Sequence, residues 1–173
     1  MAQIDFARLD LRDALDLAIL IEAEAKERYE QFSRIVGGRY KGDASEVFRT
    51  MAGYEARHGA QLAERRAKLF GKQPPRVSRD MIDDVEAPDQ GTPRVFMSAR
   101  QALEVALASE EKAHDFFDDA LRHVKDPEVK KLFEELRAEE LEHKRLLSER
   151  LDGLPQGPDV EEAEADEPGS DAG

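Results

Sequence analysis

Two segments of the chain carry the same stripe of apolar side chains at helical spacing, and a single glutamate interrupts each stripe. Steps of three and four residues place all members of a stripe on one face of a helix. The first stripe consists of Leu11, Leu15, Ala18, Glu22, Ala25, Tyr29, Phe32 and Val36. The second, displaced by 88 residues, consists of Ala99, Leu103, Ala106, Glu110, Ala113, Phe117, Ala120 and Val124. Each stripe predicts a buried helix face with one charge in it.

A second pair of stripes is interrupted by the motif Glu-x-x-His. The first of them consists of Ala44, Phe48, Met51, Glu55, His58, Leu62, Arg66 and Leu69. Its counterpart, 85 residues later, consists of Val129, Phe133, Leu136, Glu140, His143, Leu147, Leu151 and Leu154. The offset falls from 88 to 85 because the first hairpin loop is three residues longer, so the chain is a duplicated helical hairpin. Arg66 departs from the stripe near its end, where we expect the long side chain to reach solvent.

The signals for helix ends agree with this repeat. We predict helices over about 9–36, 43 or 44 to 70, 99–124 and 127–151. Glycines follow the first two helices, Ser98 is placed to cap the third, and Asp126-Pro127-Glu128 is a typical helix start. The sequence therefore predicts an all-α fold, a four-helix bundle made of two duplicated helical hairpins, within a domain of residues 1–151.

The segment 71–97, which joins the two hairpins, contains four prolines and no sustained periodicity. A short helical turn is expected at about 79–85. The segment is too long for a simple hairpin loop, but it can run the length of a bundle. A long crossover between two hairpins is one of the known bundle topologies.

Composition narrows the class of protein. Residues 152–173 hold eight acidic residues and no basic one, which predicts a disordered acidic tail and leaves −5 of the net charge of −13 on residues 1–151. This excess of negative charge disfavours nucleic acid as a partner.

The absence of cysteine excludes disulfides, thiolate chemistry and a rubredoxin-type iron centre. We expect a cytoplasmic protein, since the first residues are no signal peptide and no apolar run suffices for a membrane span.

The charges within the apolar stripes predict a metal centre. Removing a carboxylate from water is costly unless it is compensated, and four carboxylates meeting in a core would also repel one another. Two histidines cannot neutralise them, whereas two divalent cations can. An ionic network without metal, or a site that has lost its metals, is the structural alternative. Carboxylate oxygens with one imidazole per ion suit two iron ions, with manganese as the alternative. The expected ligands are Glu22, Glu55, His58, Glu110, Glu140 and His143.

At these residues the chain resembles the ferritin-like superfamily and, within it, the rubrerythrin-like di-iron proteins. The resemblance covers about residues 9–151 and is carried by Glu22-Ala-Glu-Ala-Lys-Glu-Arg-Tyr29, Glu55-Ala-Arg-His58, Glu110 with Phe117, and Glu140-Leu-Glu-His143. It implies that Glu55 and Glu140 bridge the two ions. It also implies that Glu22 and Glu110 are terminal ligands and that each ion takes one histidine.

Two departures shape the functional expectation. Peroxide-reducing rubrerythrins usually carry an extra glutamate where this chain has Ala113, and full rubrerythrins add a cysteine-ligated iron domain that is lacking here. The resemblance is therefore to the erythrin type and favours a ferroxidase, which oxidises Fe(II) with O2 or H2O2 in iron handling and oxidative-stress protection. The alternatives are a peroxidase reduced by a separate electron donor and a metal-binding or interaction module without turnover. The resemblance also implies a homodimer or larger assembly.

Overall fold

The computed structural model describes residues 4–38, 40–82, 85–91 and 93–155. These residues form four long helices and two short 3-10 turns: η1 (Phe6–Arg8), α1 (Leu11–Val36), α2 (Ala44–Phe70), η2 (Arg79–Met81), α3 (Ala99–His123) and α4 (Pro127–Asp152). No β-strand occurs in this part of the chain. The predicted all-α four-helix bundle is confirmed, and the helix limits expected from the sequence lie within two residues of those observed.

Each long helix begins at a side chain that caps its free N–H groups. Asp10 accepts a hydrogen bond from the backbone N–H of Asp13, and Asp43 accepts one from Glu46, at 2.9 and 3.0 Å. Ser98 forms a reciprocal capping box with Gln101 at the start of α3. Asp126 caps α4 ahead of the proline at its first position. The starts of the helices are thus encoded locally.

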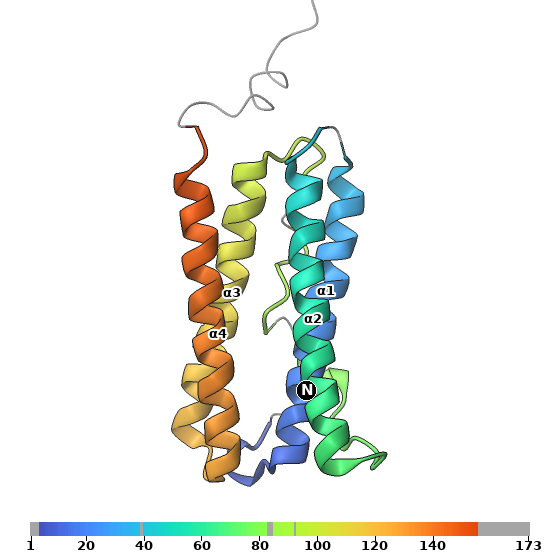
Figure 1. Cartoon of the computed structure of the whole chain (residues 1–173), viewed down its shortest axis with the longest axis vertical. Helices are drawn as coiled ribbons and strands as arrows, with labels where there is room; N and C mark the ends of the chain where they lie inside the picture. Colours follow the sequence, from blue (N-terminus) through green and yellow to red (C-terminus); the bar gives the residue numbers. More distant parts are fainter. Residues whose placement is uncertain (1–3, 39, 83–84, 92, 156–173) are drawn as a thin grey trace, which may run out of the picture.

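The four helices form two antiparallel hairpins, α1 with α2 and α3 with α4, that stand side by side (Figure 1). The crossover, residues 71–97, joins the end of α2 to the start of α3, and its described residues lie along the bundle (Figure 1). The apolar core is divided into two layers. One layer lies around Leu15 and Phe133 near the start of α1, and the other lies around Phe32 and Phe48 near its end. The interrupting charges of the four stripes lie between these layers.

Arg66 does not reach solvent, so that expectation is wrong. Its side chain is 8% exposed, and its Nε and Nη2 donate to the Asp16 carboxylate on α1 at 2.8 and 3.1 Å. The same guanidinium donates to the carbonyl oxygens of Gly71 and Gln73, which begin the crossover. Arg66 therefore fastens the crossover to α1. Leu69, expected on the same apolar stripe, is 54% exposed at the end of α2.

No helix in the described residues combines the length and apolar character needed to cross a membrane. Helix α4 ends at Asp152. Most of the predicted acidic tail, residues 156–173, lies outside the described residues, and the predicted domain limit at residue 151 stays a prediction.

We expect Arg66→Met to lower the melting temperature by several degrees, because it leaves the Asp16 carboxylate buried without its partner and releases the start of the crossover. The control is Arg65→Met, which removes an exposed ion pair with Glu135 and should change stability little. Thermal unfolding by circular dichroism measures both. Equal melting temperatures for the two variants would contradict this role of Arg66.

Candidate metal centre

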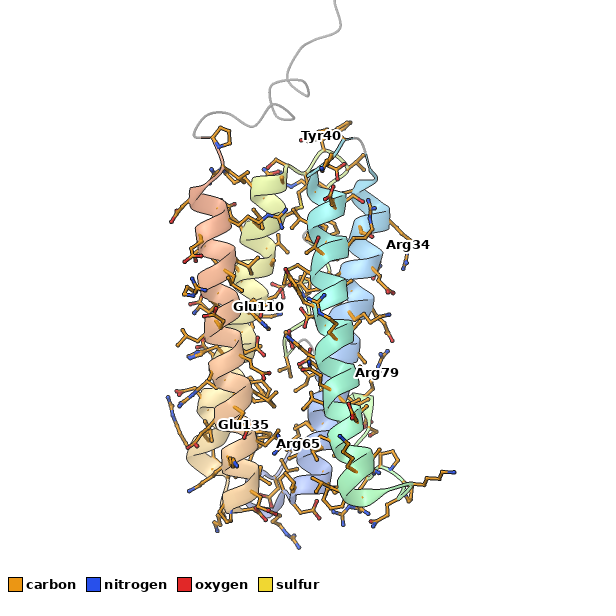
Figure 2. All side chains as sticks on the ribbon, in the orientation of Figure 1. Arg34, Tyr40, Arg65, Arg79, Glu110 and Glu135 are labelled. Atoms are coloured by element: carbon orange, nitrogen blue, oxygen red, sulfur yellow. The ribbon has the colours of Figure 1, made fainter. Side chains whose placement is uncertain are left out.

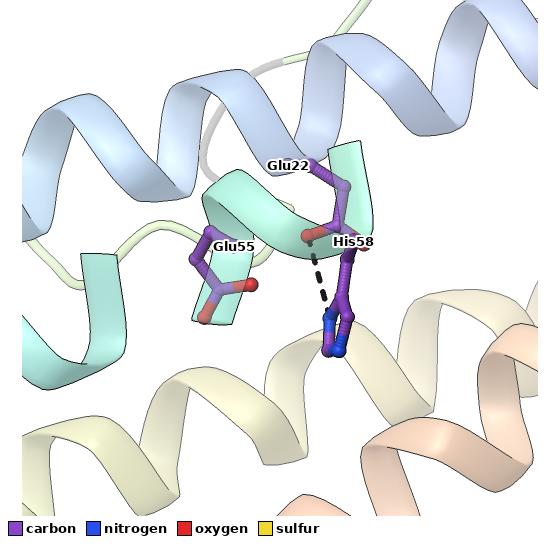
Figure 3. Close-up of side chains that lie close together, drawn as sticks. All are labelled: Glu22, Glu55 and His58. Carbon is purple, nitrogen blue, oxygen red and sulfur yellow. Dashed lines mark ion pairs between the residues drawn. The ribbon is translucent and has the colours of Figure 1, made fainter. Parts of the chain in front are cut away.

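The six residues predicted from the sequence meet halfway along the bundle. Each hairpin contributes a trio, and within each trio three ligand atoms, one per residue, all lie within 4.8 Å of one another. The first trio is Glu22 on α1 with Glu55 and His58 on α2 (Figure 3). The second is Glu110 on α3, at mid-height in Figure 2, with Glu140 and His143 on α4. The i, i+3 spacing of Glu-x-x-His explains how one helix supplies two members of each trio.

The four carboxylates of these trios are almost fully buried, with exposed fractions between 0 and 4%. Five of their eight oxygens have no hydrogen-bond partner among the described residues: Glu22 Oε2, both oxygens of Glu55, Glu110 Oε1 and Glu140 Oε2. Buried polar atoms without a partner are rare in folded proteins, since each costs the hydration it has lost. The donor set of carboxylate and imidazole groups fits divalent or trivalent cations such as iron.

The crossover adds a fifth carboxylate that the sequence analysis missed. Glu86 is 1% exposed, and neither of its carboxylate oxygens has a hydrogen-bond partner in the described part of the chain. Its ligand oxygens form close groups with Glu22 and Glu140, and with Glu55 and Glu110, again within 4.8 Å. The crossover has no helical periodicity, so no apolar stripe in the sequence indicated that Glu86 would be buried. The only local signal was one acid among apolar neighbours, in Val85-Glu86-Ala87-Pro88.

The two histidines lie face to face but have different partners. Their rings stack with centroids 4.7 Å apart and planes 4° from parallel. His143 Nδ1 lies 2.9 Å from Glu110 Oε2 and 3.3 Å from Glu140 Oε2. His58 Nδ1 lies 4.0 Å from Glu22 Oε2, the ion pair drawn in Figure 3. The duplicated trios are therefore alike in composition but unequal in their internal bonding.

Because of this difference in contacts, the pKa values of the two histidines shift in opposite directions. Burial opposes a charge on His143, but its close contacts with the carboxylates of Glu110 and Glu140 raise its pKa to about 11. For His58, burial and the neighbouring His143 lower the pKa. Burial, reinforced by repulsion between carboxylates, raises the pKa of Glu22, Glu55 and Glu86 well above the usual value. Burial likewise raises the pKa of Glu140 to about 9.

The neighbours of the centre agree with the sequence analysis. Tyr29 and Phe117, seven residues after Glu22 and Glu110, are 0 and 2% exposed, so their expected core positions are confirmed. Burial and the charges of Glu110 and Glu55 raise the pKa of the Tyr29 hydroxyl well above its usual value. His114 belongs to neither trio, and its Nδ1 lies 3.2 Å from the Asp115 carboxylate.

A pocket of about 140 Å³ opens between α2 and α4 beside the centre. His58 lines this pocket together with Gln61 and the exposed Glu139. Arg65 and Glu135 pair across its wall at 2.7 Å (Figure 2). Glu142 pairs with Arg145 and does not line this pocket. Among the six residues of the two trios, His58 alone lines this pocket.

The metal-free protein should lose stability as pH rises from about 7 to 9. Glu140 and His143 both have folded pKa values, about 9 and about 11, above their ordinary values of 4.5 and 6.5. The folded state therefore binds protons more tightly than the unfolded state, and this stabilisation fades at about 1.4 kcal/mol per pH unit for each proton of difference. His58, Asp10 and Glu27 have lowered pKa values, so they titrate below this range. Thermal unfolding in chelator tests this, and a melting temperature that rises with pH would contradict it.

Comparison with known proteins agrees with this geometry. The family model of the ferritin-like domain matches residues 12–157. A conserved protein from Magnetospirillum magnetotacticum MS-1 has a similar structure, with 28% identity, a TM-score of 0.66, and coverage of 86% of this chain and 98% of that one. No curated protein matches the sequence.

Two more distant structures share the fold. A hypothetical protein from Pyrococcus furiosus is 21% identical with a TM-score of 0.55, and the alignment covers 84% of this chain and 90% of that one. The bacterioferritin of Rhodobacter capsulatus, solved with a metal-free dinuclear site and haem iron, is 21% identical with a TM-score of 0.52 and 82% coverage of both chains. With the match to the family model over most of its length, the chain belongs to the ferritin-like domain family.

Proposed function

We propose that this protein is a ferroxidase-type di-iron oxidoreductase that binds two Fe(II) ions between its hairpins and oxidises them with O2 or H2O2. The observation that carries the proposal is the pair of buried trios, each with two carboxylates and one imidazole, whose oxygens lack hydrogen-bond partners among the described residues. An ionic network without metal does not account for those oxygens, because it would satisfy them with donors. Manganese in place of iron is the alternative metal.

Glu22, Glu55 and His58 would hold one ion, and Glu110, Glu140 and His143 the other. The resemblance to rubrerythrin-like proteins assigns bridging positions to Glu55 and Glu140. The Glu110 and Glu140 carboxylates raise the pKa of His143, so its imidazole has to lose a proton before it can bind an ion, and loading should release protons. The apolar layers on either side keep water from the carboxylates, and the pocket beside His58 gives a small oxidant access.

The electrons come from the substrate. Each Fe(II) loses one electron, and the pair of electrons with two protons reduces O2 to H2O2, or reduces H2O2 to two waters. Bound iron supplies this redox chemistry, which carboxylate and imidazole side chains cannot supply themselves. A homodimer or larger assembly, an external electron donor and a cytoplasmic location stay predictions.

A peroxidase reduced by a separate partner is the second candidate, and Glu86 favours it. Ala113 occupies the place where peroxide-reducing relatives carry an extra glutamate, and this had counted against peroxidase activity. Glu86 brings an extra carboxylate to the same centre from the crossover. Sustained turnover of H2O2 with an added electron donor would distinguish this function from single oxidation of Fe(II).

Anaerobic titration with Fe(II), followed by O2 or H2O2 in separate experiments, tests the function. Wild type should bind two irons per chain and develop Fe(III) absorbance quickly. The double variant Glu55→Ala/Glu140→Ala should bind fewer ions and lose at least about 100-fold in oxidation rate, since one carboxylate ligand of each trio is gone. The control Glu111→Gln removes an exposed carboxylate beside Glu110 and should behave as wild type. Equal rates in all three proteins would refute a ferroxidase at this centre.

A further inference from the structure

Glu86 is the one carboxylate of the centre that the duplication does not explain. The other four come in symmetric pairs, one from each hairpin, whereas Glu86 comes from the crossover that joins the hairpins. Both of its oxygens are buried and lack hydrogen-bond partners in the described residues. A carboxylate that accepts no hydrogen bond and faces four others does not stabilise the bundle by itself. A bound cation close to Glu86 would compensate the negative charge of this carboxylate.

The backbone next to Glu86 is fastened to both hairpins. Arg28 on α1, 7% exposed, donates from Nη1 to the carbonyl oxygen of Pro88 at 2.7 Å. Lys112 on α3 donates from Nζ to the carbonyl oxygen of Ala87 at 2.8 Å and pairs with Asp89 at 3.0 Å. These two cations hold the crossover across α1 and α3, directly after Glu86. They fix the point at which the side chain enters the centre.

The fastened segment and the pocket lie on different sides of the centre. The crossover is held by α1 and α3, whereas the pocket beside His58 lies between α2 and α4. In Figure 1, α2 and α4 are in front and α1 and α3 behind them. The crossover thus covers the side of the centre away from the pocket, and Glu86 approaches the ions from there.

We propose that Glu86 is a seventh protein ligand of the metal centre and that metal binding holds the crossover against the bundle. This rests on the proposed function, because it requires that the trios bind two ions. Four carboxylates balance two divalent ions, and the fifth leaves a charge of −1. With two trivalent ions the five carboxylates leave +1, where four would leave +2. Glu86 thereby favours retention of the oxidised ions.

Two consequences follow for the chain. Segment 85–91 should be less free to open when the centre is loaded, since one of its side chains binds the ions. Arg28 and Lys112 are positioning residues, because they act on metal only through the placement of Glu86. Replacing Arg28 or Lys112 by a neutral residue should weaken metal binding when Glu86 is present, and it should have little effect once Glu86 is replaced.

Binding of Mn²⁺, which avoids oxidation chemistry, tests the proposal by calorimetry at fixed pH. Wild type should bind two ions per chain, and Glu86→Gln should bind them at least about 10-fold more weakly. The matched control is Asp80→Asn, which removes the same charge from an exposed position of the same crossover. It should stay within about 2-fold of wild type, as expected for a screened surface charge. Glu86→Gln with wild-type affinity would overturn the assignment, whereas a wild type that fails to bind two ions would refute the proposed function instead.

Hydrogen exchange supplies a second readout, which reports on the crossover itself. In wild type, Mn²⁺ should slow amide exchange in peptides covering 85–91, and Glu86→Gln should lose this protection. Lys112→Met should lower Mn²⁺ affinity a few-fold in wild type but not in the Glu86→Gln background. No protection of 85–91 in a protein that binds two ions, or equal effects of Lys112→Met in both backgrounds, would overturn the coupling between metal and crossover.

Discussion

The burial of five carboxylates in one layer is the constraint on which the rest of the structure depends. Most of their oxygens have no hydrogen-bond partner among the described residues, and each charge would cost several kcal/mol if it were left uncompensated. The two apolar layers, which lie on either side of these carboxylates, supply the buried apolar surface that keeps the hairpins together. A bundle of this kind gains its stability at the ends and places its chemistry in the middle.

The crossover is part of the centre as well as a connection. Arg66 fastens its beginning to Asp16, and Arg28 and Lys112 fasten its later part to both hairpins. Each of these cations binds backbone carbonyl oxygens, which are present whatever the crossover sequence is. A segment without regular structure is thereby held firmly enough to place one buried side chain, Glu86, beside residues that lie far from it in the sequence.

The duplication gives the centre two similar halves, yet the tertiary structure makes them unequal. His143 is bound to Glu110 and Glu140, while His58 is free of so close a contact and lies at the pocket. The pKa values of the two imidazoles consequently move in opposite directions. The two trios therefore differ in how firmly the imidazole holds a proton and in their access to the pocket.

The sequence by itself determined the four helices, their caps, the duplication and the six residues of the two trios, because helical periodicity and capping depend on residues within a few positions of each other. It also determined that Tyr29 and Phe117 lie in the core. Only the tertiary structure decided that Arg66 is buried against Asp16 and that Glu86 lies among the carboxylates of the two trios. Arg66 lies 50 positions from Asp16, and Glu86 meets glutamates that lie 24 to 64 positions away in the sequence. No local pattern encodes the path of the crossover that brings Glu86 there.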